Sequence, residues 1–132
     1  MGTNQTGIES ARVLFVEDEF LISEWVTQSL TEQGFRVLTV SNAAEALRAL
    51  RSDAVDVLFT DINLPGGMDG AALARRAREM QPHLAVVYAS ARSNALNPAD
   101  RVPGSCFVPK PYEPSAVGRL LIEKAAEAKA LA

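Results

Sequence analysis

The sequence predicts an α/β fold in which helices cover both faces of a mostly parallel five-stranded sheet. Two features indicate this fold. Short apolar runs rich in β-branched and aromatic residues recur along the chain, each bounded by polar or turn-forming residues. Stretches with helical spacing of apolar residues lie between these runs. Strands that alternate with helices form βαβ units, whose right-handed crossovers place helices on both sides of the sheet.

Strands are expected where three to six consecutive residues are mainly apolar. The first run is VLFV, and the second, FRVLTV, carries more polar residues. The runs VDVLFT and LAVVYA follow, and CFV is the last and shortest. In chain order the predicted strands cover residues 13–16, 35–40, 55–60, 84–89 and 106–108.

Four helices are expected between and after these strands. They cover residues 20–33, 42–51, 69–80 and 113–131. The last of them carries an apolar stripe that we expect to pack on the sheet, because a covering helix must bury such a stripe. A dimer contact is the alternative use of this stripe.

The connection between the fourth and fifth strands is the least regular part of the sequence. Residues 91–105 are crowded with asparagine, proline and glycine. Proline and turn formers leave room for at most one or two helical turns there. The helix expected in this crossover is therefore short or irregular.

Composition limits the classes of protein to which the chain can belong. With 132 residues, 48% of them hydrophobic, the chain is long enough for one packed core. We expect this domain to cover residues 11–132, behind a flexible polar tail of residues 1–10. The net charge of -3 argues against direct DNA binding. No apolar stretch approaches the roughly 20 residues that span a bilayer, so no membrane association and a cytoplasmic location are expected.

Two uncommon residues receive structural interpretations. Cys106 is the single cysteine, which excludes an intrachain disulfide, and its place in an apolar strand predicts a buried thiol. Trp25 lies within the first predicted helix, where packing is expected rather than recognition of a partner.

Five polar side chains follow the predicted strands at the points where the strands end. They are Glu17, Asp18, Asp61, Ser90 and Lys110. In a parallel α/β sheet, polar ligands bind in the crevice outside the carboxyl ends of the strands. We therefore expect these side chains to meet at one edge of the sheet.

This set of residues suits a phosphoryl group and a hard divalent cation. Three carboxylates repel one another unless a cation lies among them, and carboxylate and carbonyl oxygens favour Mg²⁺. Lys110 and Ser90 can each bind a phosphate oxygen. An aspartate can form an acyl phosphate, and Asp61 is the central candidate for this nucleophile.

Taken singly, each of these residues has a simpler interpretation. Asp18 is suited to cap the helix that begins near Glu19. Asp61 precedes a sequence typical of a strand-ending turn. The functional interpretation depends on the joint arrangement at successive strand ends.

The chain resembles the receiver domain of bacterial two-component response regulators, the CheY-like family. The segments VLFVEDE, FTDINLPGGMDG, VVYASA and FVPKPY carry the resemblance, in the family's order and spacing, from about Arg12 to the end. The resemblance implies a flavodoxin-like fold with strand order 2-1-3-4-5. Glu17 stands where aspartate is more common in the family, and Ser90 stands where threonine is.

Residue roles follow from the resemblance. It implies that Asp61 is the phosphoacceptor and that Mg²⁺ is held by Asp18, Asp61 and the backbone carbonyl of Asn63, with Glu17 acting through water. Ser90 takes the switch position, and Phe107 is the aromatic residue coupled to it. Lys110 is expected to pair with the phosphoryl group and to precede a cis peptide bond.

The resemblance also implies a function. A sensor histidine kinase or a phosphotransfer protein is expected to donate the phosphoryl group, and the switched surface is expected to bind an unknown downstream protein. The chain is expected to catalyse its own phosphorylation and dephosphorylation without being a turnover enzyme, as a single-domain regulator and a monomer or weak dimer. The main alternative is a pseudo-receiver that signals without phosphate. An aspartate-dependent phosphatase and a flavin-binding protein are less favoured, because Asn63 replaces the second aspartate of the former and Glu17 and Asp18 repel an anionic cofactor.

Overall fold

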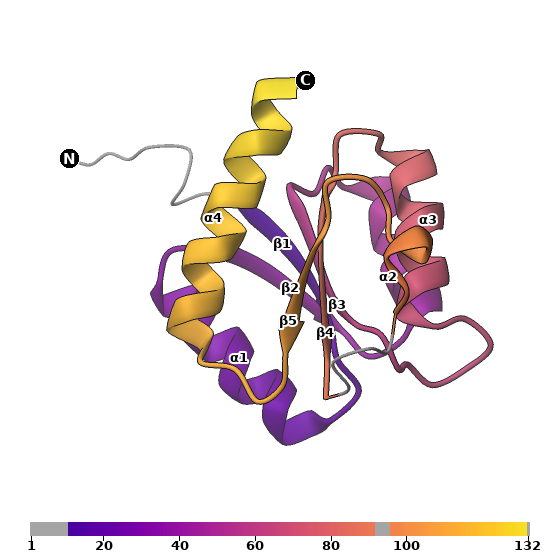
Figure 1. Ribbon diagram of the computed structural model, residues 1–132. Coiled ribbons are helices and arrows are strands. Elements are labelled where there is room, and N and C mark those ends of the chain that lie inside the picture. Colours follow the sequence, from indigo (N-terminus) through magenta and orange to yellow (C-terminus); the bar gives the residue numbers. More distant parts are fainter. Residues whose placement is uncertain (1–10, 92–95, 132) are drawn as a thin grey trace.

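The computed structural model describes residues 11–91 and 96–131 (Figure 1). The expected tail of residues 1–10 lies outside the described residues. In chain order the elements are β1 (Arg12–Val16), α1 (Phe20–Glu32), β2 (Arg36–Val40), α2 (Ala43–Ser52), β3 (Val57–Asp61), α3 (Gly70–Met80), β4 (Ala85–Ser90), the short 3₁₀ helix η2 (Pro98–Asp100), β5 (Cys106–Pro109) and α4 (Pro114–Leu131).

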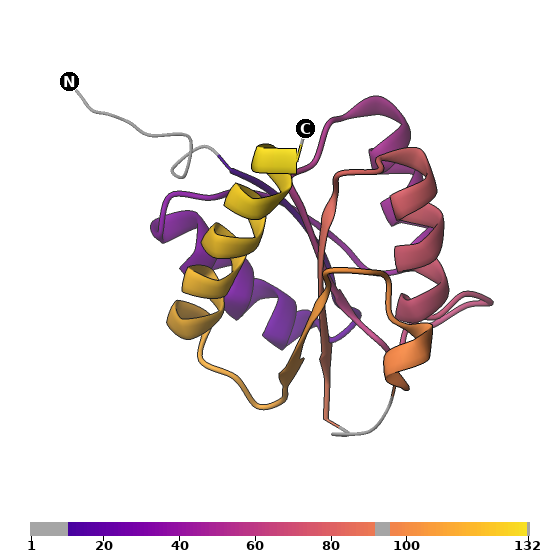
Figure 2. The same cartoon turned by 45° about the horizontal axis from the view of Figure 1, so that its top comes forward.

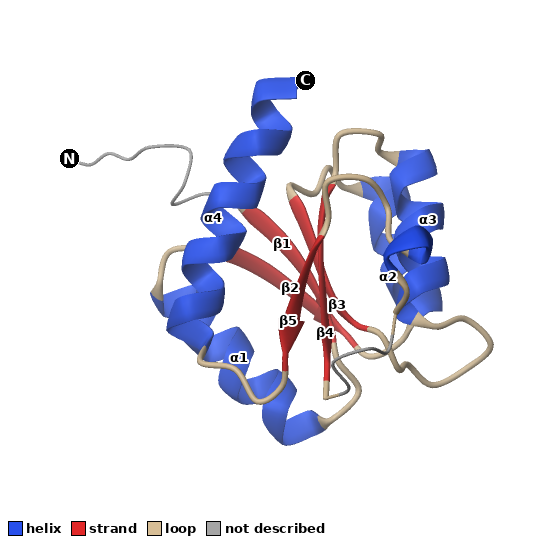
Figure 3. Cartoon of the chain, in the orientation of Figure 1, coloured by secondary structure: helices blue, strands red, loops and turns tan. Residues whose placement is uncertain are grey.

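The five strands form one parallel sheet with the order β2-β1-β3-β4-β5. Helices α1 and α4 cover one face of the sheet, and α2 and α3 cover the other (Figures 1 and 3). The three layers separate clearly when the molecule is turned (Figure 2). The predicted fold class and strand order are confirmed.

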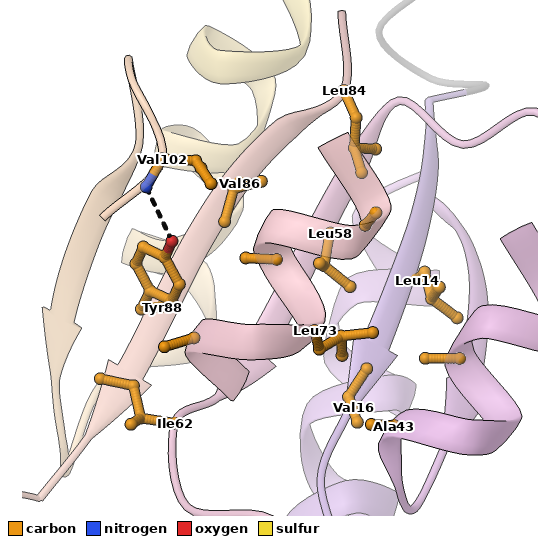
Figure 4. Packing of buried hydrophobic residues seen from close by; sticks show 14 of the residues in the cluster. Leu14, Val16, Ala43, Leu58, Ile62, Leu73, Leu84, Val86, Tyr88 and Val102 are labelled. Carbon is orange, nitrogen blue, oxygen red and sulfur yellow. Dashed lines mark hydrogen bonds between the residues drawn. The ribbon is translucent and has the colours of Figure 1, made fainter. Parts of the chain in front are cut away.

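Alternation along the strands divides the core into two clusters. In β1, Leu14 packs with the cluster under α2 and α3, and Phe15 packs with the cluster under α1 and α4. Figure 4 shows the first cluster, in which Leu73 of α3 lies over the sheet. In the second cluster the rings of Phe15 and Phe59 stack with centroids 5.1 Å apart. The sheet is therefore buried on both faces, as a parallel sheet requires.

Local side-chain contacts set where several elements begin. Asn42 and Asp69 cap α2 and α3 by accepting from the amides of Glu45 and Ala72, each at 2.9 Å. The third strand begins at Val57, two residues later than predicted. Asp56, the residue before it, accepts from the Arg12 amide through its carboxylate at 2.8 Å.

The irregular crossover between β4 and β5 is confirmed in its described part. Within residues 96–105 the helical structure is confined to η2. Leu96 and Val102 are buried on either side of η2, and the Val102 amide donates to the Tyr88 hydroxyl at 3.1 Å (Figure 4). Buried side chains and a hydrogen bond to Tyr88 therefore hold this crossover in place, although it contains no long helix in its described part.

Two structural interpretations from the sequence need correction. Cys106 packs against the cluster under α1 and α4, as a core residue does, but it is half-buried rather than buried. Trp25 is 53% exposed, and it lines an open hollow beside Lys110 and Tyr112. Across the described parts of the chain, no helix is long and apolar enough to span a membrane.

Candidate functional site

Lys110 joins two carboxylates at the carboxyl edge of the sheet. Its Nζ lies 2.9 Å from Glu17 Oε1 and 3.0 Å from Asp61 Oδ2. Glu17 follows β1, Asp61 ends β3 and Lys110 follows β5, so three strands supply this contact. The Glu17 side chain is 1% exposed and that of Asp61 is 11% exposed. Carboxylates buried to this degree require a partner charge, which the ammonium group supplies.

The acidic cluster comprises Glu17, Asp18 and Asp61. One carboxylate oxygen from each lies within 4.8 Å of the others. Asp18 is exposed, so the cluster opens to solvent on its side. Hard oxygen ligands with no histidine or thiolate in the group fit Mg²⁺, which keeps several of its waters. The donor set therefore fits the expected ion.

Backbone contacts fix the position of Glu17. Its amide donates to the Val40 carbonyl at 3.0 Å, and its Oε2 accepts from the Glu19 amide at 3.1 Å. Helix α1 begins after Glu19 with no side-chain cap. The alternative in which Asp18 serves as a helix cap is therefore wrong. Both carboxylate oxygens of Glu17 already have donors, which suits a contact with a metal through water.

Ser90 and Lys110 are linked through the backbone. Ser90 ends β4 and is fully buried, and the Lys110 amide donates to its carbonyl oxygen at 2.8 Å. Asp61 pairs with Ala89 in the sheet, so Ser90 is one residue beyond the position opposite Asp61. The peptide bond between Lys110 and Pro111 is cis, as the resemblance implies.

The two remaining predicted positions lie apart from these contacts. Phe107 lies on β5, three residues before Lys110, and pairs with Tyr88. Asn63 is exposed two residues after Asp61. The metal contact of its carbonyl group stays a prediction. Glu17, Asp18, Asp61 and Lys110 therefore lie together at one edge of the sheet, and Ser90 is joined to Lys110 there through the backbone.

The electrostatics of the site keep Lys110 positively charged. Burial alone lowers the pKa of Lys110, but its hydrogen bonds to Glu17 and Asp61 outweigh this and raise the pKa above the ordinary value of 10.5. The ammonium group therefore stays protonated throughout the physiological pH range.

Tyr112 is a site neighbour that the sequence did not single out. Its hydroxyl is buried and has no hydrogen-bond partner among the described residues. Burial, followed by the charges of Glu17 and Asp61, raises the pKa of Tyr112 above the ordinary value of 10.0. Its ring packs against Phe59 with centroids 5.5 Å apart. The Tyr112 hydroxyl therefore lies close enough to Glu17 and Asp61 to interact with their charges.

We expect Tyr112→Phe to stabilise the protein by about 1 kcal/mol near neutral pH, because a buried hydroxyl without a partner is removed. Because the pKa of Tyr112 is raised in the folded state, this residue also makes the free energy of unfolding depend on pH. The stabilisation that belongs to the protonated tyrosine is fully present below the ordinary pKa of 10.0 and is lost as the pH rises towards the folded-state value. Urea unfolding at pH 8 and at about pH 10.5 should show that the variant loses less unfolding free energy between these two pH values than the unaltered protein does. An equal loss in both proteins contradicts the assignment.

Gly70 is a second position that sequence patterns missed. A Cβ at this position would overlap the carbonyl oxygen of Asp61 and lie 2.8 Å from the Cα of Ile62. The Gly70 amide donates to the Ile62 carbonyl at 2.7 Å. The first residue of α3 therefore packs directly on the backbone of Asp61. A glycine after a capping aspartate was the available signal, but it does not reveal this contact.

The known proteins that this chain resembles are response regulators. The family model for the response regulator receiver domain matches residues 13–120. The transcriptional regulatory protein CseB of Streptomyces coelicolor is 34% identical over 89 residues, which are 67% of this chain and 37% of that protein. The chain therefore spans little more than a third of the length of that relative.

Solved structures support the same assignment. A response regulator receiver protein from Sinorhizobium medicae WSM419 is 29% identical, with a TM-score of 0.84 over 92% of this chain and 98% of that chain. The response regulator protein TrrA from Thermotoga maritima, solved in complex with Mg²⁺ and BeF, is 25% identical, with a TM-score of 0.74 over 86% of this chain and 98% of that chain.

Proposed function

The chain belongs to the response regulator receiver domain family of two-component systems, and we propose that it accepts a phosphoryl group on Asp61. One observation carries the proposal: the Lys110 ammonium binds both Asp61 and Glu17 at the carboxyl edge of the sheet, with Asp18 in the same cluster. A nucleophilic carboxylate, a cation for the phosphoryl oxygens and a set of metal ligands are thus within reach of one another.

Asp18 and Asp61 would hold Mg²⁺ directly, together with the Asn63 carbonyl, and Glu17 would reach it through water. When bound, this ion supplies charge neutralisation for the phosphoryl oxygens. The TrrA complex, which contains Mg²⁺ and BeF, shows that a protein of this fold binds such a pair.

The chain's own residues perform the transfer by positioning. A carboxylate oxygen of Asp61 forms a bond to phosphorus as the bond from phosphorus to the donor's histidine nitrogen breaks, and the bonding electrons remain on that nitrogen. Lys110 exchanges its contact with Asp61 for one with a phosphoryl oxygen. Hydrolysis then releases phosphate and restores the aspartate. The protein catalyses its own modification and turns over no separate substrate.

A kinase or phosphotransfer protein that brings its phosphohistidine to Asp61 must cover the surface around Lys110. Trp25 of α1, which is 53% exposed, lines this surface, and Phe20 and Leu21 at the start of the same helix are 70% and 80% exposed. A hollow of about 210 Å³ lies between Trp25 and Lys110. We therefore place the donor's contact on α1, where partner binding buries these side chains.

Phosphorylation adds about -1.5 to -2 charges, which draws the Ser90 hydroxyl and the Lys110 ammonium towards the new group. We propose that Ser90 and Phe107 change position together and that a downstream protein reads the altered surface. The signal passes by protein contact in the cytoplasm, without direct DNA binding, from a monomer or weak dimer.

Intact-protein mass spectrometry after incubation with acetyl phosphate tests the proposal. We expect one phosphoryl adduct that requires Mg²⁺ and is lost in Asp61→Asn. Asp53→Asn, at an exposed aspartate after α2, is the matched control and should retain the adduct. An adduct that survives in Asp61→Asn would assign the acceptor elsewhere. If neither acetyl phosphate nor a panel of phosphorylated kinases labels the protein, it is a pseudo-receiver.

A further inference from the structure

The crossover before β5 is held by side chains from separate elements. The Val102 amide donates to the Tyr88 hydroxyl of β4 at 3.1 Å (Figure 4). Arg78 of α3 donates through Nη1 to the Pro103 carbonyl at 2.9 Å. Leu96 is buried in the same cluster as Val102. Residues 96–103 therefore have a defined position although they contain only the short helix η2.

Arg101 connects this segment to the aromatic residue of the proposed switch. Its Cζ lies 5.5 Å from the centroid of the Phe107 ring. Its Nη2 donates to the Leu96 carbonyl at 3.3 Å. Its Nε is buried and has no hydrogen-bond partner among residues 11–91 and 96–131. The guanidinium is therefore held mainly by the ring face and by one carbonyl group.

Sheet register places the two anchors next to each other. Tyr88 and Phe107 are paired across β4 and β5. Tyr88 holds Val102, and Phe107 holds the preceding residue, Arg101. If the Phe107 ring moves, it displaces Arg101, while the next residue, Val102, remains bound to Tyr88. Arg78 donates to the Pro103 carbonyl, and among the described residues the cation over the Phe107 ring is Arg101 rather than Arg78.

We propose that Arg101 is a positioning residue that holds Phe107 in the conformation seen here and transmits its movement to residues 96–103. This inference rests on the proposed function, because the movement is driven by phosphorylation of Asp61. The ring must leave the guanidinium when it follows Ser90 towards the phosphoryl group. Arg101 thus opposes the phosphorylated conformation, and the segment it holds is the surface that changes when the contact breaks.

Thermodynamic linkage fixes the direction of the effect. A contact present only in the unphosphorylated conformation lowers the affinity for any ligand that favours the other conformation. A contact between a cation and an aromatic ring of this kind corresponds to roughly a threefold to tenfold change in an equilibrium constant. Arg101→Ala should therefore bind beryllofluoride, in the presence of Mg²⁺, roughly threefold to tenfold more tightly than the unaltered protein.

Two variants separate this role from simple anchoring. Arg101→Lys keeps a cation near the ring, so its affinity for beryllofluoride should lie between those of the unaltered protein and Arg101→Ala. Arg78→Ala removes another anchor of the same segment without touching Phe107, and its beryllofluoride affinity should be unchanged. Equal increases in affinity for Arg78→Ala and Arg101→Ala would overturn the proposal, because loosening of the segment would then explain both.

Nuclear magnetic resonance supplies a readout that does not depend on phosphoryl chemistry. In the full chain without Mg²⁺, the Arg101 δ-protons should be shifted upfield by the Phe107 ring, and Phe107→Leu should remove the shift. Beryllofluoride with Mg²⁺ should also remove it. A shift that persists with bound beryllofluoride refutes the inference alone, since ligand binding shows that the acceptor site works. Failure of both beryllofluoride and acetyl phosphate to react refutes the proposed function instead.

Discussion

Replacing Gly70 with alanine is expected to cost about 3 kcal/mol of unfolding free energy and to lower the yield of phosphoryl adduct. The added Cβ would overlap the Asp61 carbonyl oxygen and approach the Ile62 Cα to 2.8 Å. Both contacts are with backbone rather than with a flexible side chain, so the overlap is relieved only if α3 or the end of β3 moves. Overpacking of this kind typically costs about 1–3 kcal/mol.

The functional loss has the same origin. Asp61 ends β3, and the contact with Gly70 lies on its own backbone. A displaced Asp61 no longer keeps its carboxylate 3.0 Å from Lys110 Nζ. Transfer depends on such positioning, so the adduct should form more slowly even in molecules that remain folded.

Gly67→Ala is the matched control. A Cβ at Gly67 has no atom within 4 Å, and the residue lies in the same connection between β3 and α3. Urea unfolding and adduct formation should therefore be close to those of the unaltered protein. Equal stability losses for Gly67→Ala and Gly70→Ala would contradict the steric account and indicate a general sensitivity of this connection.

Replacing Lys110 with methionine should have an effect of similar size in the absence of Mg²⁺. The change removes the cationic partner of Glu17, whose side chain is only 1% exposed. Asp61 loses its contact with the same ammonium group. Removing one member of a buried ion pair costs about 3 kcal/mol or more, because the other charge stays buried and unpaired. Urea unfolding in a metal-free buffer at neutral pH measures the loss.

Mg²⁺ should reverse part of this loss. Without the ammonium group, the acidic cluster repels itself more strongly and binds a divalent cation more tightly, so Mg²⁺ should stabilise Lys110→Met more than the unaltered protein. The phosphoryl adduct should nevertheless form poorly, because the ammonium partner of the phosphoryl oxygens is absent.

Lys124→Met gives the comparison for a lysine outside the site. Lys124 Nζ lies 3.0 Å from Glu127 Oε1, but the Glu127 side chain is 64% exposed. The Lys124 side chain itself is 14% exposed, but its loss leaves only an exposed carboxylate, which water solvates, so a cost of about 0–1 kcal/mol is expected. A stability loss for Lys110→Met no larger than that for Lys124→Met, or one that Mg²⁺ leaves unchanged, would contradict the pairing described for Lys110.

Much of the site could be predicted because a parallel sheet imposes it. Once the strands are recognised from their apolar runs, residues that follow them must meet at one edge, and Glu17, Asp61, Ser90 and Lys110 do so. Two helix starts, at Asn42 and Asp69, also follow from local capping. These features depend on short segments or on a general rule of sheet topology.

The features that were missed depend on contacts between distant segments. Gly70 is essential because of the backbone of Asp61, and Arg101 is placed by the ring of Phe107. Trp25 has an apolar side chain in a helix, but it lines an open hollow beside Lys110 and stays half-exposed. Residue type and periodicity do not encode such neighbours, so the structure is needed to find them.

The most direct test of the account locates the phosphoryl group on the chain. After reaction with acetyl phosphate and Mg²⁺, borohydride reduces an aspartyl phosphate to homoserine, and peptide mass spectrometry identifies the modified position. Homoserine is expected at position 61 of the unaltered protein, and none is expected in samples that lack Mg²⁺. Homoserine at another aspartate, or a phosphorylated protein with no reducible acyl phosphate, would contradict it.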